Sequence, residues 1–297
     1  MKQNLLCFAA AALLMSSCGG IVPEEELVIN LQEKGAEVAP SMYGIFFEEI
    51  NHAGDGGLYA ELVKNRSFEE LEMPEGYYAE GDILHPKEVC NHLTGEVRHG
   101  SFRWTTEPVP GWILQTGENS SAEMKLTKEN PKFQSASNNL KVTIKDASAP
   151  VRLVNGGYWG MNLVKDDSYL LRAILRTSAD YKGKITALLL SDTDEVLALA
   201  PVEVDGSGSW NDVHQTLRPS ATAAKGKLAL EFDGTGTVSL DYVSLFPEKT
   251  FRDRPNGLRN DVAEMLNGLH PAFVRWPGGC VVEGISLENR FEWKKTL

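Results

Sequence analysis

The sequence predicts an α/β chain that is interrupted by an inserted all-β sandwich. Two segments predict the α/β part: Tyr43–Glu69 reads as a strand, a glycine-rich turn and a helix, and Phe273–Gly279 (FVRWPGG) reads as a strand entering a Pro-Gly-Gly turn. Between 101 and 247, short alternating runs recur with turn signals between them and no strong helical pattern, which predicts a sandwich of the jelly-roll type.

The first α/β segment covers residues 27–70. Leu27–Leu31 alternates weakly and predicts a strand, while the largely apolar Tyr43–Ile50 predicts a strand buried on both faces. Gly54–Gly57 predicts a turn. The i, i+4 pairs after it predict a helix that faces the core: Leu58 with Leu62, and Tyr59 with Val63.

The second α/β segment covers residues 248–297. Asn260 or Asp261 caps a predicted helix, which Asn267-Gly268 and Pro271 end. Ala272–Trp276 is the next predicted strand. The predicted core face of the helix consists of Val262, Met265, Leu266 and Leu269.

The predicted sandwich covers residues 101–247, and residues 71–100 join it to the first α/β segment. Glycine-rich turns separate its expected strands. Examples of these strands are Leu140–Ile144, Tyr169–Arg176, Ile185–Leu190, Val196–Val204, Lys227–Phe232 and Val238–Leu245.

The N-terminal residues 1–17 read as an export signal. Lys2 supplies the positive charge and Leu5–Met15 is an apolar run too short to span a bilayer as a helix. Small residues surround Cys18, which predicts a lipoprotein signal with Cys18 lipidated; simple secretion is the alternative. Residues 18–26 then form a tether. The protein is expected to be lipid-anchored in the periplasm or on the cell surface.

The net charge of −12 argues against nucleic acid and anionic lipid as partners, and a neutral ligand such as sugar fits better. Cys90 and Cys280, the two cysteines that are neither in the signal nor lipidated, do not make a disulfide framework. The six histidines are scattered, with no HExxH and no CxxC motif, so no metal site and no cofactor is expected.

Two adjacent carboxylates end the strand of the first segment. Glu48 and Glu49 point to opposite faces, so they are not the paired carboxylates of a glycosidase. One of them could point into a barrel mouth and accept hydrogen bonds from sugar hydroxyls. The alternative is that one caps the turn and the other is solvated. Asn51 and His52 follow on the loop, where sugar contact and turn formation explain Asn51 equally well.

The RWPGGC sequence ends the later strand. A buried Arg275 would need a carboxylate or carbonyl partner, and the glycines before Cys280 bring bare backbone amides close to whatever lies above them. An ordinary strand-ending turn is the alternative.

Aromatic residues of the sandwich region suggest a stacking platform for sugar rings, although core packing explains most such residues. The strongest pair is Tyr158-Trp159, because it follows Gly156-Gly157 in an expected loop. The full set is Trp104, Trp112, Tyr158, Trp159, Tyr181 and Trp210.

Three segments together resemble the family 51 α-L-arabinofuranosidases: YGIFFEEINHAGDGGLYAELVKNRSFE, RPNGLRNDVAEML and FVRWPGGCVVEGISLENRFEWKKT. The inserted sandwich resembles carbohydrate-binding modules of the CenC-like group, with weaker motifs. The resemblance implies the incomplete N-terminal part of a (β/α)₈ TIM barrel that is interrupted by this module.

The resemblance implies a retaining hydrolase that releases terminal α-L-arabinofuranose from arabinan, arabinoxylan or arabinogalactan. Glu48 matches a glutamate that binds arabinose hydroxyls, and Gly279 and Cys280 match the loop that lines the same subsite. The positions of the acid/base and nucleophile glutamates lie beyond Leu297. The expectation is therefore a fragment with no catalytic residue and no activity alone. Family members often form homo-oligomers.

An alternative hypothesis makes the chain a binding protein rather than an enzyme. Under it, the chain is an exported glycan-binding lipoprotein that acts through the sandwich without catalysis, with Tyr158 and Trp159 as glycan contacts. A third reading is that the sandwich only packs against the barrel and binds nothing.

Overall fold

The computed structural model describes residues 29–49, 51–70, 77–87, 101–103, 107–279 and 292. The predicted signal peptide and tether, with Cys18, lie outside the described residues, as do Ile50, Cys90, Trp104 and Cys280. The chain divides into two compact units, Met1–Met42 and Tyr43–Leu297. None of the described helices is long and apolar enough to cross a membrane.

In the first unit, the 3-10 helix η1 (Pro40–Met42) is the regular element that the structure assigns among residues 29–42. The strand predicted over Leu27–Leu31 does not form in its described part, residues 29–31, and that prediction is wrong there. Ile29 and Leu31 are exposed, because no neighbouring strand is available among the described residues to pair with this weak alternating pattern.

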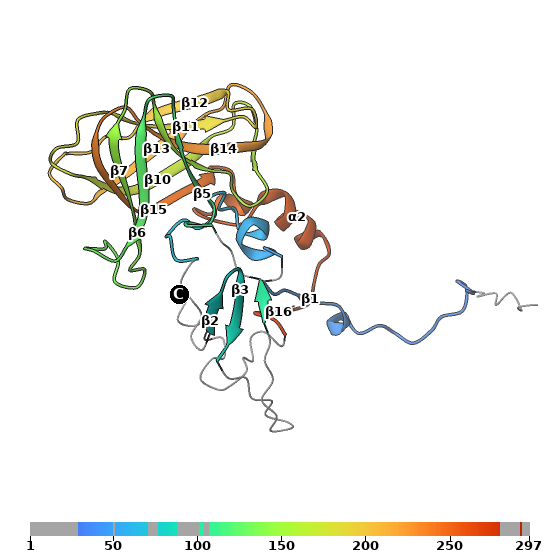
Figure 1. Ribbon diagram of the computed structural model, residues 1–297. Helices are drawn as coiled ribbons and strands as arrows, with labels where there is room; N and C mark the ends of the chain where they lie inside the picture. The colour runs from blue at the N-terminus through green and yellow to red at the C-terminus, as the bar shows by residue number, and fades with distance from the viewer. Residues whose placement is uncertain are drawn as a thin grey trace, which may run out of the picture. The chain divides into compact units, whose positions relative to one another are not determined.

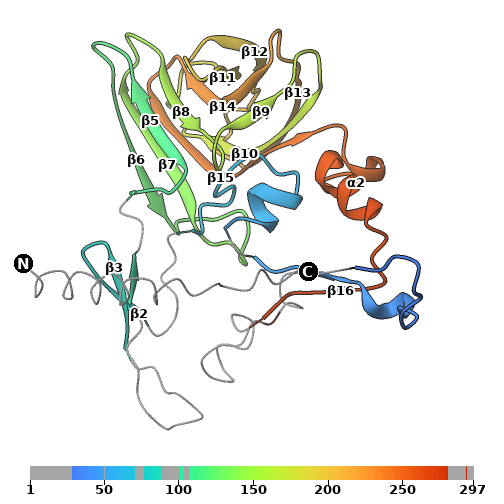
Figure 2. The same ribbon diagram turned by 90° about the vertical axis from the view of Figure 1, so that its right-hand side faces the viewer.

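The larger part of the second unit is an antiparallel β-sandwich, shown with its labels in Figures 1 and 2. One sheet has the order β13-β10-β15-β7-β6. The other has the order β12-β11-β14-β8-β5, with β9 pairing β14. The strands are β5 (Trp112–Thr116), β6 (Ser121–Thr127), β7 (Asn139–Asp146), β8 (Val151–Asn155), β9 (Met161–Leu163), β10 (Tyr169–Thr177), β11 (Ile185–Leu190), β12 (Val196–Pro201), β13 (Asn211–Leu217), β14 (Ala223–Phe232) and β15 (Gly236–Pro247).

The core lies between the two sheets and follows the alternation of the strands. Leu140, Val142 and Ile144 of β7 point inward, as do Leu228 and Leu230 of β14, and each is at most 2% exposed. Full burial of such a side chain stabilises the fold by about 1.5–3 kcal/mol. The strands expected in this region are confirmed, since all six lie at the predicted positions.

The segment 59–70 is extended over residues 59–63, continues in turns and packs on the sandwich, so the helix predicted from Leu58 onward is wrong. A short distorted helical turn, η2 (Gly54–Leu58), precedes the segment. The segment then hydrogen-bonds to β15: the Leu62 N–H donates to the Leu245 carbonyl (3.0 Å), and the Val243 N–H donates to the Arg66 carbonyl (2.9 Å). The i, i+4 apolar spacing had indicated a helix, but pairing with β15 satisfies the backbone in an extended form.

The remaining α/β part consists of β1 (Ile45–Phe46), the 3-10 helix η3 (Phe251–Asp253), helix α2 (Asn260–Gly268) and β16 (Val274–Arg275). Strands β1 and β16 pair in parallel. The helix and both strands lie where the sequence predicts them, although the strands are shorter and Arg259, rather than Asn260 or Asp261, is the N-cap residue.

The predicted burial of this α/β part is wrong at several positions, although Val262 and Leu266 are half-buried. Met265 is 76% exposed, Leu269 69% and Val274 59%. A helix and a two-stranded sheet cannot cover their apolar faces without a second layer, and the described residues supply none for these positions.

A separate antiparallel sheet joins β2 (Tyr77–Glu80), β3 (Ile83–Pro86) and β4 (Phe102–Arg103).

Candidate functional site

The carboxylate of Glu48 and the backbone of Gly279 meet just beyond the paired strands. Glu48 follows β1, Gly279 follows β16, and the Gly279 N–H donates to Glu48 Oε2 at 3.0 Å. Parallel strands place their carboxyl ends at one edge, which is where barrel enzymes hold their substrates. The structure therefore brings together two of the residues that the sequence singled out.

The Pro-Gly-Gly turn lies directly against the Glu48 side chain. Gly278 has φ +132°, and a Cβ atom at this position would stand 2.2 Å from the Glu48 Cβ. Only glycine fits both the backbone conformation and the space. At Gly279 an added Cβ would meet its nearest atom, Glu48 Oε2, at 3.4 Å. The first glycine thus permits the approach, and the second supplies the N–H donor.

Glu49 has a different role from Glu48. Its Oε2 accepts hydrogen bonds from the Gly54 N–H (2.7 Å) and the Asp55 N–H (3.1 Å), which fixes the loop after β1. Within this loop, Asn51 (φ 51°) and His52 (φ 59°) adopt left-handed backbone conformations and are exposed. The two adjacent carboxylates bind separate backbone groups, as expected for side chains on opposite faces of a strand.

Arg275 is exposed, so the prediction that it is buried with a carboxylate or carbonyl partner is wrong. Its guanidinium lies over the ring of Phe46, 4.8 Å from the centroid. The two residues are partners in the β1–β16 register. A cation–π contact of this kind leaves the charge in water, which explains why the side chain needs no buried partner.

The aromatic pair Tyr158-Trp159 contacts the loop after β1. The ring of His52 lies 4.9 Å from that of Tyr158 and 5.4 Å from that of Trp159, between centroids. Tyr158 is half-buried against Gly56, where a Cβ would stand 2.3 Å from the Tyr158 Cγ. Burial raises the pKa of the Tyr158 hydroxyl. Trp159 is 63% exposed.

The described aromatic residues do not form one platform. Trp112 is buried against Phe68, and its indole N–H donates to the Asn65 carbonyl. Trp210 lies beneath the Arg176 guanidinium, 4.7 Å from the centroid, and the Tyr181 hydroxyl donates to the Lys184 carbonyl. Of the described members of the set, Tyr158 and Trp159 are the two that lie together.

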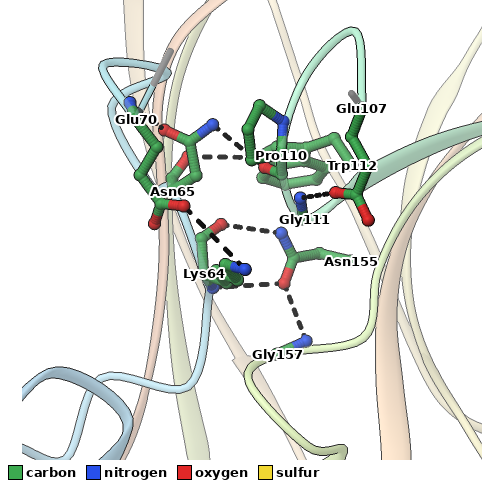
Figure 3. Close-up of polar contacts among 9 residues, drawn as sticks. All are labelled: Lys64, Asn65, Glu70, Glu107, Pro110, Gly111, Trp112, Asn155 and Gly157. Carbon is green, nitrogen blue, oxygen red and sulfur yellow. Dashed lines mark hydrogen bonds and ion pairs between the residues drawn. The ribbon is translucent and has the colours of Figure 1, made fainter. Parts of the chain in front are cut away.

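The loop that carries this pair is anchored by the buried Asn155 (Figure 3). Its Oδ1 accepts hydrogen bonds from the Lys64 N–H (3.2 Å) and the Gly157 N–H (2.9 Å), and its Nδ2 donates to the Lys64 carbonyl (2.9 Å). One amide thus joins the end of β8, the Tyr158 loop and the segment 59–70. Sequence reasoning missed Asn155; an asparagine before two glycines is the signal that could have found it.

A groove of about 680 Å³ lies beside the aromatic pair. Residues of the sandwich and of the α/β part line it, among them Tyr158, Trp159, Asp167, Arg259 and Asp261. Arg259 and Asp261 form a bidentate pair (2.7 and 3.2 Å), and these hydrogen bonds lower the pKa of the Asp261 carboxyl. The groove combines exposed aromatic surface with carboxylates that accept hydrogen bonds.

A second carboxylate that sequence reasoning missed is Glu61. It is 1% exposed and accepts hydrogen bonds from the Ser244 hydroxyl (2.5 Å), the Leu245 N–H (2.9 Å) and the Val63 N–H (3.0 Å). Burial raises the pKa of the Glu61 carboxyl despite these bonds. The predicted helix concealed this role, because a glutamate beside an apolar helical face is ordinarily solvated.

Among the described residues, no cluster of three or more histidine, cysteine, aspartate or glutamate side chains could hold a metal ion. Cys280, predicted beside Gly279, lies outside the described residues.

Comparison with known proteins gives consistent matches. Residues 265–297 match the model of the α-L-arabinofuranosidase 1 domain. The chain is 31% identical to an extracellular exo-α-L-arabinofuranosidase of Streptomyces chartreusis over 97% of this chain and 32% of that protein. It is 31% identical to α-L-arabinofuranosidase 1 of Arabidopsis thaliana over 93% of this chain and 37% of that protein.

A solved structure agrees with these sequence matches. The arabinose-bound GH51 α-L-arabinofuranosidase superposes with a TM-score of 0.70 and 27% identity, over 90% of this chain and 39% of that one. The chain spans about a third of the length of the curated relatives it matches. In sequence and in fold, the chain is therefore similar to the N-terminal portion of the family 51 α-L-arabinofuranosidases.

Proposed function

We propose that this chain supplies part of the arabinose-binding site of a glycoside hydrolase that releases terminal α-L-arabinofuranose from arabinose-containing polysaccharides. The hydrogen bond between Glu48 and Gly279 carries the proposal, because it joins the two strand ends that the family resemblance assigns to the arabinose subsite. In the proposal, β1, α2 and β16 belong to a (β/α)₈ barrel, and the sandwich is an inserted carbohydrate-binding module.

The chemistry of the pair fits a neutral sugar. An ionised Glu48 accepts hydrogen bonds from sugar hydroxyls, and charge-assisted bonds of this type are stronger than neutral ones. The backbone of Gly278 and Gly279 gives a sugar ring close access without side-chain obstruction. We place Cys280 and Asn51 at the same subsite. In the family, two further glutamates perform the retaining reaction, one as acid/base and one as nucleophile; no residue of this chain is assigned to either role.

The test of this function compares the wild-type chain with Glu48→Gln, using L-arabinose as the probe and saturation-transfer NMR as the measurement. The substitution removes the charge while keeping an oxygen that can accept from the Gly279 N–H. Arabinose affinity should fall about tenfold or more, as expected for loss of a charged hydrogen-bond partner. Release of 4-nitrophenol from 4-nitrophenyl α-L-arabinofuranoside by the protein expressed from the complete gene tests the hydrolase activity. Equal arabinose binding by both forms would reject the assigned subsite.

A second candidate function is glycan binding by the sandwich without catalysis, and the exposed ring of Trp159 favours it. Under this reading, affinity for arabinan depends on Trp159 and is indifferent to Glu48→Gln. Affinity electrophoresis of Trp159→Ala and Glu48→Gln in arabinan-containing gels separates the two functions.

We also propose that the chain is exported, with Cys18 lipidated. The Streptomyces relative is named extracellular, which supports export. Radiolabelled palmitate should enter the wild-type protein and not Cys18→Ala; secretion of an unlabelled wild-type protein would favour a plain signal peptide.

A further inference from the structure

We propose that Trp159 and His52 form a sugar-stacking subsite next to the Glu48–Gly279 position, which takes the sugar unit to which a terminal arabinofuranose is linked. The inference rests on the proposed function, because it extends the ligand held at Glu48 by one unit or more. It also assigns the exposed aromatic ring of the sandwich to the same ligand as the α/β part, rather than to an independent site.

The positions of the residues support a continuous ligand. His52 lies four residues beyond Glu48, so their Cα atoms are at most about 14 Å apart. Glu49 fixes the intervening loop by accepting the N–H groups of Gly54 and Asp55. The ring of Trp159 reaches this loop, with its centroid 5.4 Å from that of His52. A short oligosaccharide held by Glu48 at one end therefore lies within reach of the indole.

Among the described residues, the ring contacts with His52 and Tyr158 leave most of the Trp159 side chain uncovered. The Trp159 side chain is 63% exposed, whereas Trp112, a side chain of the same size, is 3% exposed in the core. Exposed aromatic residues at the edge of a groove are typical of binding surfaces. The flat apolar face of an indole suits the C–H face of a sugar ring, and its rigidity limits the entropy lost on binding.

The loop that carries Trp159 is also held in place before any ligand arrives. Asn155 anchors the loop to Lys64 and Gly157, and the Gly160 N–H donates to the Gly156 carbonyl (3.0 Å). The neighbouring Tyr158 packs against the bare backbone of Gly56. A stacking residue that is fixed in advance binds with less loss of conformational entropy than a mobile one.

The charge of the adjoining groove disfavours anionic sugars as ligands. Six carboxylates line it, against two basic side chains, Lys249 and Arg259, and Arg259 is already paired with Asp261. Carboxylates accept hydrogen bonds from hydroxyls and repel anionic chains. A neutral arabino-oligosaccharide fits this groove, whereas a polyuronate does not.

The experiment titrates the wild-type chain, Trp159→Ala and Glu48→Gln with two probes, α-1,5-linked arabinotriose and L-arabinose, by isothermal titration calorimetry. Trp159→Ala should weaken arabinotriose binding about tenfold more than it weakens L-arabinose binding, while Glu48→Gln weakens both. The matched control is Tyr78→Ala, since Tyr78 is also an exposed ring stacked on a histidine, His85, but belongs to the β2–β3 sheet. It should leave both affinities unchanged.

Fluorescence supplies a second readout that does not depend on a fully folded alanine variant. Arabinotriose should shift the indole emission of the wild-type chain, L-arabinose should shift it less, and Trp159→Phe should lose the difference.

The outcomes separate the two proposals. If Glu48→Gln weakens both ligands and Trp159→Ala affects them equally, the stacking subsite is wrong and the arabinose subsite stands. If arabinotriose binding depends on Trp159 but not on Glu48, the sandwich binds glycan independently and the continuous subsite is overturned. If the wild-type chain binds neither probe, both proposals fail.

Discussion

The buried carboxylate of Glu61 links the segment 59–70 to the sandwich, because it accepts hydrogen bonds from the hydroxyl of Ser244 (2.5 Å) and the N–H of Leu245 (2.9 Å) on β15. These residues are more than 180 positions away in the sequence. The contact makes the segment 59–70 part of the sandwich structure rather than a linker beside it.

Glu61→Gln should increase the free energy of unfolding at neutral pH. Burial raises the pKa of Glu61 above 4.5, so the folded chain binds its proton more tightly than the unfolded chain. Stability therefore falls as the pH rises from 4.5 through the raised pKa. Glutamine keeps the two backbone contacts through its oxygen and can donate to Ser244, without the charge. The gain over wild type should grow across this window and then level off.

Urea unfolding between pH 4 and pH 8 measures the Glu61 effect, with the exposed Glu203→Gln as the control. A pH-independent difference between Glu61→Gln and wild type would show that the carboxyl is not destabilised by burial. Glu61→Ala, which leaves two backbone N–H groups without a partner, should cost about 1–3 kcal/mol for each.

Gly278→Ala and Gly279→Ala form a matched pair at the Pro-Gly-Gly turn. The first substitution adds a Cβ 2.2 Å from the Glu48 Cβ at a φ of +132°, so it must displace the turn from Glu48. The second adds a Cβ whose nearest atom, Glu48 Oε2, lies 3.4 Å away, at ordinary van der Waals distance. Gly278→Ala should reduce L-arabinose affinity about tenfold or more, and Gly279→Ala much less, by calorimetric titration. The opposite order would contradict the geometry of the turn.

Phe68→Ala should destabilise the sandwich by about 3–5 kcal/mol, the usual cost of truncating a buried phenylalanine. Phe68 is fully buried and its ring lies 5.6 Å from that of Trp112. Chemical denaturation measures the loss. Leu199→Ala, at a side chain that is 67% exposed on β12, should change stability by less than about 0.5 kcal/mol. A loss below 1 kcal/mol for Phe68→Ala would mean that the segment is not part of this core.

Asn155→Ala should cost about 2–5 kcal/mol, because it leaves the N–H and the carbonyl of Lys64, and the N–H of Gly157, without their partner. The same variant should weaken arabinotriose binding, since the Trp159 loop loses its anchor. Thermal unfolding and calorimetry measure the two effects, with the exposed Asn162→Ala as the stability control. Unchanged stability of Asn155→Ala would refute the anchoring role.

Six of the eleven sandwich strands were named from the sequence, because alternation is a local property, whereas β5, β6, β8, β9 and β13 were not. Each named run, such as Leu140–Ile144 or Val238–Leu245, carries its own inward and outward faces. Helix α2 was predictable for the same reason, from its apolar spacing and its Asn-Gly end. The turn after β16 was identified from its glycines.

The error at the segment 59–70 shows the limit of local patterns. Leu58, Leu62, Tyr59 and Val63 fit a helix, yet residues 59–63 are extended and turns follow them, because β15 offers backbone partners to Leu62 and Arg66. The choice between a helix and an extended segment is therefore decided by a strand more than 170 residues away. A short stretch of sequence around Leu62 does not contain that strand. The exposure of Met265 and Val274 has a related origin, since burial requires a covering layer that spacing cannot reveal.

The sequence by itself determined the β-strands of the sandwich, helix α2 and the chemistry of the two strand ends at Glu48 and Gly279, because these depend on side-chain type and on short-range spacing. Tertiary structure alone decided that Glu61 and Asn155 are buried connectors, and that Trp159 reaches the loop of His52. These contacts join residues that are far apart in the chain, so they exist only in the tertiary structure and no local sequence pattern reveals them.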